Sequence, residues 1–429
     1  MHTIELTWSL PSVSDNSGSV SLFVSHESGS NFSIGVTTVS YIAEDPSGNT
    51  AYCWFSVAVK AVARPLFDDT NATRMNISTS EIIEKFDKLS DTLSQLKDLN
   101  ISAEETGLLA QDILQSMNKA IEVFKNTSEH DINDQDMDLL TKSVLRTTDD
   151  LAKFVLCNIE AGSGHVLETS AIRLNVDFDS AEKLTNTSVE MGDGHTFRLP
   201  EMQNLFLNWT SRQPIGRIVK RLLRRSFRHD DNANVYDVLS MSFTDGELND
   251  LEVNGTEEDI SITFAGDYQA FETPVVVEGV YLEYDDVTYF GMDVNITHLF
   301  HAVIINLESP HAVYGITEAY IFNDMVEYSS NYSGYQFSVD AQFDGGNSSI
   351  FIPENYIFKA ERYYLTFTVP QKQDVKFSMS VKHVVCDYLN EESGTWKNDG
   401  CKVSPESNMT STVCLCNHLT TFKTNIEID

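Results

Sequence analysis

The residues best suited to chemistry are His418, Leu419 and Thr420, close to the end of the sequence. A threonine hydroxyl is a poor nucleophile until a nearby base takes its proton, and imidazole has a suitable pKa at neutral pH. Because His418 and Thr420 are two positions apart, they can share one face of a strand. We therefore expect an intramolecular acyl shift, in which His418 deprotonates Thr420 Oγ1 and this oxygen attacks the Leu419 carbonyl carbon. Water then hydrolyses the resulting ester. The alternative is an uncleaved threonine in an ordinary strand.

Four cysteines surround this stretch and limit how it can be held. Cys414 and Cys416 are two positions apart, so on a strand they point to the same face and are poorly placed to bond each other. Each then pairs with Cys386 or Cys401, which leaves two connectivities. A zinc site built from all four is the competing interpretation, but the separation of Cys386 from Cys401 is wide for the usual zinc clamp.

The stretch 386–422 resembles a GPS motif, the self-cleavage signature that closes a GAIN domain in adhesion receptors and polycystin-type proteins. Besides the cysteines, the resemblance is carried by Trp396, Gly400, His418-Leu419-Thr420 and Phe422. It implies cleavage at the Leu419–Thr420 bond and structural roles for Trp396, Gly400 and Phe422. It also implies two disulfides, which pair the first cysteine with the third and the second with the fourth: Cys386–Cys414 and Cys401–Cys416.

The residues after the proposed cut are expected to stay bound as a last strand. Apolar and polar side chains alternate there, which is typical of a strand with one buried face: Phe422, Ile426 and Ile428 against Lys423, Asn425 and Glu427. Adhesion G-protein-coupled receptors often continue after the cut with a strongly apolar tethered agonist. The peptide Thr420–Asp429 is more polar than that.

Upstream, three apolar stripes at helical spacing predict a helical subdomain A over residues 80–163. Ser102-x-x-Glu105 predicts a capping box before the second helix. From 164 to 429, alternating runs separated by turns predict a large β-sandwich, subdomain B, that ends in the GPS motif. Helical region, sandwich and motif together resemble a GAIN domain over residues 80–429. The stripes are Ile82, Phe86, Leu89, Leu93 and Leu96; Leu109, Ile113, Met117, Ala120 and Phe124; and Leu140, Val144, Leu151 and Val155.

Residues 1–63 alternate with period two between Ser, Gly, Asn, Asp and Pro turns, which predicts a small antiparallel sandwich. Asp45-Pro-Ser-Gly-Asn49 supplies one turn. The run from Phe32 to Phe55 resembles a hyalin repeat (HYR), an Ig-like adhesion module. Cys53 is expected either to lack its partner because the module is truncated or to pair with Cys157. Residues 64–79 are expected to be a linker.

Composition points to an extracellular protein without nucleic-acid partners. The formal net charge of −35 over 429 residues repels phosphates. Six cysteines fit an oxidising compartment. No secretory leader or membrane helix is evident, so we expect an ectodomain fragment. Twelve Asn-x-Ser/Thr sites favour glycosylation: Asn31, Asn71, Asn76, Asn100, Asn126, Asn186, Asn208, Asn254, Asn295, Asn331, Asn347 and Asn408.

Two other motifs are set aside. Asp131, Asn133 and Gln135 suggest a calcium loop, but Asp136 stands where the loop needs glycine and Lys142 where it needs glutamate. We therefore expect no metal and no cofactor.

The basic cluster 220–228 contains Arg221-Leu-Leu-Arg224, a minimal convertase pattern. An exposed amphipathic segment is the favoured interpretation.

The sequence thus predicts a multidomain, mainly β protein: an HYR module, then a GAIN domain with helical and sandwich subdomains. We expect the extracellular region of a multi-pass membrane receptor on the cell surface that serves adhesion, mechanosensing and signal regulation. Its expected partners are its own last strand, a downstream transmembrane region and an extracellular protein or glycan ligand.

Phe197-Arg-Leu-Pro200 and Val238–Phe243 favour the polycystin lineage. The alternatives are an adhesion receptor with a tethered agonist and an uncleaved structural adhesion protein. A turnover protease is disfavoured, since His418 and Thr420 flank their own scissile bond.

Overall fold

The computed structural model divides into two compact units, residues 1–170 with 176–178, and residues 171–175 with 179–429. Each unit is described by itself. The described residues are 3–16, 18–33, 35–59, 78–96, 101–127, 134–206, 213–223, 237–266, 275–278, 280–284, 287–296, 301–308, 313–314, 319–322, 335–337, 342–343, 347–357, 361–369, 376–390 and 393–428.

The N-terminal module is built from two small antiparallel sheets, as its alternation predicts. One sheet pairs β1 with β3, and the other has the order β2-β4-β5. Trp8 packs between Phe32 and Phe55, with ring centroids 5.8 and 5.4 Å away, and its Nε1 donates to the hydroxyl of Tyr41. Oδ1 of Asp45 accepts the N–H groups of Ser47 and Asn49, which forms the predicted turn. The strands are β1 (Thr3–Leu6), β2 (Ser21–Val24), β3 (Ser30–Ser33), β4 (Gly35–Glu44) and β5 (Thr50–Val59).

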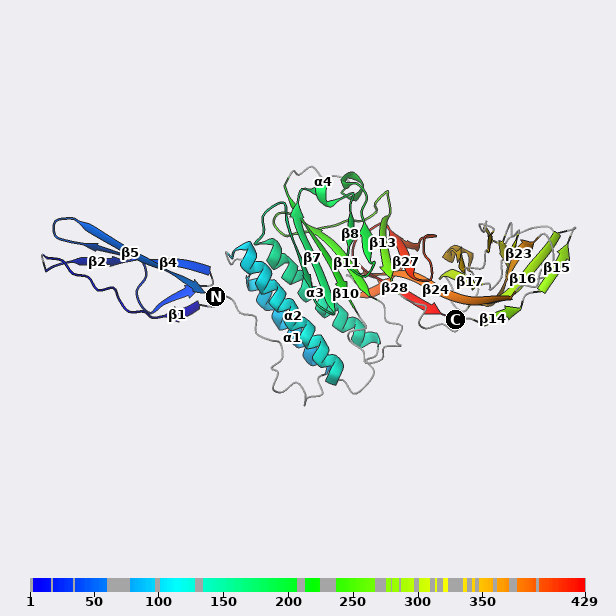
Figure 1. Cartoon of the computed structure of the whole chain (residues 1–429), viewed down its shortest axis with the longest axis horizontal. Coiled ribbons are helices and arrows are strands. Elements are labelled where there is room, and N and C mark those ends of the chain that lie inside the picture. Colours follow the sequence, from blue (N-terminus) through cyan, green and yellow to red (C-terminus); the bar gives the residue numbers. More distant parts are fainter. Residues whose placement is uncertain are drawn as a thin grey trace. The chain divides into compact units, whose positions relative to one another are not determined.

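Three long helices follow (Figure 1), and their ranges contain the three sets of apolar residues predicted from the sequence. The apolar residues predicted to face inward on the second and third helices are all buried, while Leu89 of the first is half-buried. At the second helix, Glu105 N–H lies 3.3 Å from Ser102 Oγ, and the Ser102 hydroxyl donates to the Glu105 carboxylate. The serine half of the predicted capping box is therefore confirmed, and the Glu105 carboxylate accepts from the Ser102 hydroxyl. The helices are α1 (Thr79–Leu96), α2 (Ala103–Thr127) and α3 (Asp134–Leu156), and the strand β6 (Ser163–Glu168) comes next.

The C-terminal region contains the predicted sandwich. Its larger sheet has the order β22-β17-β24-β28-β11-β10-β7, with β12 beside β11 and with β14 and β25 beside β24. The long strand β24 pairs with β17 on one side and β28 on the other. These strands are β7 (Ile172–Asp179), β10 (Ile215–Leu222), β11 (Val238–Thr244), β12 (Asp250–Leu251), β14 (Val275–Glu278), β17 (Ala302–Glu308), β22 (Asn347–Ile352), β24 (Lys376–Asn390), β25 (Thr395–Lys397) and β28 (Thr421–Ile428).

The smaller sheet has the order β26-β27-β13-β9-β8, and one apolar core lies between it and the larger sheet. That core takes Ile262 and Phe264 from β13, and Met241 and Phe422 from the facing sheet. Burying side chains of this size contributes about 1.5–3 kcal/mol each. The strands are β8 (Ser188–Glu190), β9 (Thr196–Arg198), β13 (Ile260–Ala265), β26 (Cys401–Val403) and β27 (Ser411–Cys416).

Further elements complete the described chain. A third sheet has the order β15-β16-β23-β19-β20, and β18 pairs with β21. Short helices interrupt a region expected to be without regular helix. The elements are β15 (Val280–Tyr284), β16 (Val287–Ile296), β18 (Val313–Tyr314), β19 (Ala319–Phe322), β20 (Tyr335–Phe337), β21 (Gln342–Phe343), β23 (Glu361–Val369), α4 (Ala181–Leu184), α5 (Met202–Leu205) and η4 (Glu354–Tyr356).

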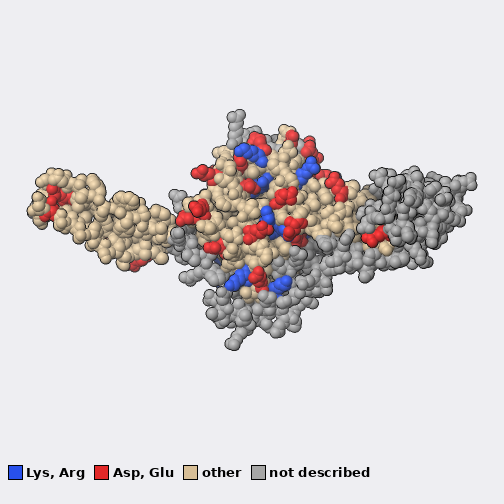
Figure 2. Space-filling view, in the orientation of Figure 1, with Lys and Arg blue, Asp and Glu red and all other residues tan. Residues whose placement is uncertain are grey.

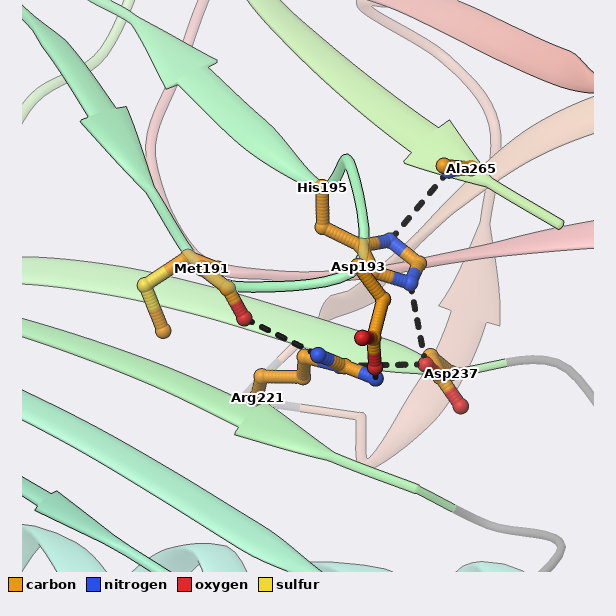
Figure 3. A network of polar contacts seen from close by, with 6 residues as sticks. All are labelled: Met191, Asp193, His195, Arg221, Asp237 and Ala265. Carbon is orange, nitrogen blue, oxygen red and sulfur yellow. Dashed lines mark hydrogen bonds and ion pairs between the residues drawn. The ribbon is translucent and has the colours of Figure 1, made fainter.

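The basic cluster was wrongly interpreted as an exposed segment. Lys220 and Arg221 lie in β10 and are both buried, with 3% of each residue exposed. Arg221 tolerates burial because its guanidinium donates to Asp237 at 3.2 Å, to Asp193 at 2.5 Å and to the Met191 carbonyl at 3.0 Å (Figure 3). Residues 224–228, which include the second arginine of the convertase pattern, lie outside the described residues.

Charged side chains of both signs share the surface. On the face drawn in Figure 2, lysines and arginines lie among aspartates and glutamates over the central part, whereas the HYR module shows acidic side chains alone. Residues 1–59 indeed contain no lysine or arginine. No described helix is both long and apolar enough to span a membrane.

Candidate autoproteolysis site

The three candidate catalytic residues lie where the chain passes from one sheet of the sandwich to the other. β27 ends at Cys416 in the smaller sheet, and β28 begins at Thr421 in the larger one. His418, Leu419 and Thr420 therefore occupy the crossing between the two strands. The apolar residues of both strands fix its ends, because Cys414 and Cys416 face the core from one side and Phe422 from the other.

Two disulfides brace the strand before the crossing. Cys386 of β24 is bonded to Cys414 of β27, which joins the two sheets across the core, with 5.8 Å between their Cα atoms. Cys401 of β26 is bonded to Cys416, its partner in the neighbouring strand. These are the pairs that the GPS resemblance implies. All four sulfurs are in disulfides, so none is a thiolate ligand, which removes the zinc alternative. The described residues hold no cluster of His, Cys, Asp and Glu suited to a metal ion.

His418 has one ring nitrogen in use and one available. Its Nδ1 lies 3.1 Å from Asn417 Oδ1. Because a carboxamide oxygen only accepts, this contact places the ring proton on Nδ1 and leaves a lone pair on Nε2. Nε2 is buried and has no hydrogen-bond partner. The arrangement gives His418 the form that a general base needs.

The surroundings of the ring favour its neutral form. Burial lowers the pKa of His418 below its ordinary value of 6.5, and the negative charge of Asp399 opposes that shift. The Tyr388 ring meets the imidazole edge-on, with centroids 4.3 Å apart, and its hydroxyl donates to Asp399 at 3.1 Å. Burial, followed by the hydrogen bond to Asp399, raises the pKa of Tyr388. Tyr388 thus packs against the imidazole, and the charge of Asp399 acts on it.

Gly400 permits this packing. A Cβ atom there would lie 2.8 Å from Asn417 Oδ1 and 3.2 Å from His418 Nδ1, and the residue has φ = +83°. Both the close approach and the positive φ require glycine. The role of Gly400 in the motif is therefore to let the 398–401 turn lie against the His418 ring.

The Thr420 hydroxyl is not directed at His418 in this structure. Its Oγ1 donates to the Leu389 carbonyl at 3.1 Å, and the Thr420 carbonyl accepts the N–H of Met241 at 3.1 Å. The backbone of Thr420 is thus held by β11, while its side-chain hydroxyl is hydrogen-bonded to Leu389. The structure brings the three candidate residues into one crossing, with the Thr420 hydroxyl bonded to a carbonyl rather than to His418.

The strand after the candidate bond is held on both edges. β28 pairs with β24 along Phe422–Ile428 and with β11 along Thr421–Lys423. The side chains of Phe422 and Ile426 are buried with 1% exposed, whereas that of Ile428 is outside the described side chains. Trp396 of β25 stacks on the last strand as well, with Lys423 Nζ 4.3 Å from its ring centroid.

Sequence reasoning missed several residues of the site. Tyr388 and Asp399 lie inside the 386–422 stretch, and Asn398-Asp399-Gly400 is a turn signal, but nothing in the spacing ties either residue to His418. The carbonyl acceptor at Leu389 and the amide donor at Met241 are backbone groups, which leave no trace in residue type.

The remaining predicted residues are dispersed over the described surface. Cys53 is an exposed thiol and forms no disulfide with Cys157. Asn31, Asn186, Asn254 and Asn295 are exposed, as glycosylation requires, and Asn408 is half-buried. Seven sites lie outside the described side chains: Asn71, Asn76, Asn100, Asn126, Asn208, Asn331 and Asn347.

Comparison with known proteins agrees with this geometry. The HYR domain model matches residues 1–59, and the GAIN subdomain B model matches residues 338–423. Polycystin-1-like protein 3 of Mus musculus is 29% identical over 148 residues, which cover 33% of this chain and 7% of that protein. The Homo sapiens protein of the same name is 34% identical over 76 residues, or 16% of this chain and 4% of that protein. The chain therefore spans a small part of these relatives.

Among solved structures, the full extracellular region of zebrafish Gpr126/Adgrg6 is similar to this chain at 13% identity and a TM-score of 0.30. The match covers 89% of this chain and 39% of that one. Modules of these kinds and the two disulfides are of the extracellular type. The chain carries an HYR domain at its start and a GAIN subdomain B with the GPS motif at its end.

Proposed function

We propose that this chain is part of the extracellular region of a polycystin-like, multi-pass membrane receptor that cuts itself once, between Leu419 and Thr420. The His418 ring carries the proposal: a neutral imidazole with a buried, unpartnered Nε2 lies two residues from a threonine hydroxyl. In the first step Thr420 Oγ1 leaves the Leu389 carbonyl and loses its proton to Nε2. The oxygen then bonds to the Leu419 carbonyl carbon while the Leu419–Thr420 C–N bond breaks and the nitrogen takes the proton.

Water completes the reaction by hydrolysing the ester, which frees the Leu419 carboxylate and restores the Thr420 hydroxyl. No disulfide joins the two pieces after the cut, because all four bridged cysteines precede it. The pieces remain associated through non-covalent contacts. Retention then depends on the backbone pairing of β28 on both edges and on burial of Phe422 and Ile426. Each of these two side chains contributes about 1.5–3 kcal/mol. Load or ligand binding that withdraws β28 would signal to the membrane part of the receptor at the cell surface.

The test is expression of residues 1–429 as a secreted protein, with two matched variants. Thr420→Ala removes the nucleophile, so we expect no cleavage while secretion persists. Thr421→Ala removes the neighbouring hydroxyl, which donates to Ser240 Oγ at 3.1 Å, and should leave cleavage intact. Denaturing mass spectrometry after removal of N-glycans reports the cut. Size-exclusion chromatography under native conditions reports whether Thr420–Asp429 stays bound.

A second function is favoured by one observation. The Thr420 hydroxyl is hydrogen-bonded to Leu389 rather than to His418. An uncleaved, purely structural adhesion protein would keep that bond permanently. Wild-type protein that remains at full mass would support this second function and contradict the first.

A further inference from the structure

A second segment crosses between the two sheets beside the candidate bond. The chain leaves β12, next to β11 in the larger sheet, and reaches β13 in the smaller sheet through residues 252–259. β11 pairs with β28, after the bond, and β13 pairs with β27, before it. The two crossings meet in an isolated antiparallel bridge between Asn254 and His418.

The second crossing grips the peptide groups on both sides of His418. Thr256 N–H donates to the Asn417 carbonyl at 2.9 Å, and Leu419 N–H donates to the Val253 carbonyl at 3.0 Å. The first bond fixes the peptide plane before His418 and the second fixes the plane after it. Because φ and ψ of a residue relate these two planes, the pair of bonds sets the backbone of His418 and the direction from which its ring leaves the chain.

The gripping segment is itself anchored. Val253 is buried in the sandwich core with 4% exposed, and Thr256 is 8% exposed. Gly255 makes the turn between them at φ = +66°, and a Cβ added there would meet nothing within 4 Å. The Asn254 side chain, in contrast, is exposed. The backbone of the segment does the holding, while its polar side chain faces solvent.

We propose that residues 253–256 form a positioning clamp for self-cleavage, an inference that rests on the proposed function. The clamp holds the peptide before Leu419, and the Met241 N–H holds the peptide after Thr420. The scissile peptide is thereby bracketed by two fixed groups, one in the 252–259 crossing and one in β11. After the cut, the same bonds hold each new end in place: Leu419 on the Val253 side and Thr420 on the β11 side.

The first test removes one bond of the clamp. Thr256→Pro deletes the N–H that donates to Asn417, and it also destroys the Asn254 glycosylation site. Asn254→Gln destroys that site but keeps the N–H, and Thr256→Ser keeps both. We expect Thr256→Pro to slow cleavage at least about tenfold, as one lost positioning contact does in mutant enzymes, while Asn254→Gln and Thr256→Ser cut as wild type does. The cleaved fraction is followed by denaturing mass spectrometry at fixed times after synthesis is stopped.

A second pair of variants decides the matter if the proline variant is not secreted. Gly255→Ala strains the backbone of the clamp without a steric clash, and Gly162→Ala does the same at φ = +89° in the turn before β6. In each substitution the new Cβ is placed on a residue in the left-handed region, which L side chains rarely adopt. We expect cleavage to slow several-fold in Gly255→Ala and to stay at the wild-type rate in Gly162→Ala.

The outcomes separate the two levels of the proposal. Wild-type protein that is never cut removes the proposed function and the clamp with it. Wild-type protein that is cut, together with a folded Thr256→Pro that is cut equally fast, removes the clamp alone. Equal rates for Gly255→Ala and Gly162→Ala would do the same.

Discussion

Two histidines in the same sandwich, His195 buried and His418 half-buried, show how the surroundings decide whether both nitrogens of an imidazole are hydrogen-bonded. His195, after the turn 192–194, has both nitrogens occupied: the Ala265 N–H donates to Nδ1 at 3.3 Å, and Nε2 lies 3.1 Å from Asp237 (Figure 3). His418 uses Nδ1 alone and leaves Nε2 buried without a partner. A fully hydrogen-bonded histidine stabilises its surroundings, whereas a buried nitrogen with a free lone pair costs stability and is available to take a proton.

The sharpest test of this contrast replaces each histidine by glutamine. His418→Gln should lower the cleavage rate by about 10²–10⁴-fold, since general-base assistance is worth that much, and should leave the melting temperature nearly unchanged. His195→Gln should leave cleavage intact in the folded fraction. It should destabilise the protein by about 1–3 kcal/mol, because it disturbs buried hydrogen bonds to Asp237 and Ala265. Mass spectrometry and denaturant unfolding measure the two effects. Equal cleavage rates and equal stabilities in the two variants would contradict the difference proposed between His418 and His195.

Arg221→Met tests the structural half of the contrast further. The substitution leaves the Asp237 carboxylate, whose side chain is 13% exposed, without its cationic partner, so we expect a loss of about 3–5 kcal/mol in the free energy of unfolding. Lys423→Met, which removes the ammonium 4.3 Å from the Trp396 ring centroid, serves as the control and should cost no more than about 1 kcal/mol. Denaturant midpoints decide between the two, and an Arg221→Met protein as stable as wild type would show that the network stabilises nothing.

The pH dependence of cleavage tests the state of His418. Because burial lowers the pKa of its imidazole below 6.5, more than half of the folded protein carries a neutral His418 at pH 6.5. The cleavage rate should therefore fall with decreasing pH, with its midpoint below 6.5. The same shift means that the folded protein binds a proton at His418 less readily than the unfolded chain does. The free energy of unfolding should therefore decrease as pH falls below 6.5. A rate midpoint above 6.5 would contradict a buried base.

Tyr388→Phe should give the smallest effect. The ring that packs on His418 remains, and the hydroxyl that donates to Asp399 is lost. We expect a change of about 0.5–1.5 kcal/mol in stability and a cleavage rate within a few-fold of wild type. Tyr388→Ala, which removes the ring too, should slow cleavage more. Equal rates in the two variants would show that the ring does not position the imidazole.

The sequence predicts those parts of the molecule that depend on local pattern. Residues such as Phe124 and Val155 fall on helical stripes because a helix repeats its apolar face at a fixed spacing. The cysteine spacing, with the GPS resemblance, led to the two disulfides because a strand sends alternate side chains to opposite faces.

Contacts between distant segments could not be predicted in this way. Arg221 looks like a surface residue in a basic run, and its burial depends on Asp193, in the turn between β8 and β9, and on Asp237, just before β11. The contact of Val253 with Leu419 is a backbone bond across more than 160 positions, so no residue type announces it. The orientation of the Thr420 hydroxyl toward Leu389 is likewise a matter of tertiary packing.

The central claim is that this chain breaks its own Leu419–Thr420 bond and retains the fragment. Denaturing mass spectrometry of the secreted wild-type protein, after native purification and removal of N-glycans, tests it most directly. The account predicts two species that co-purify, one ending at Leu419 and one consisting of Thr420–Asp429. A single species that carries the intact bond would contradict it.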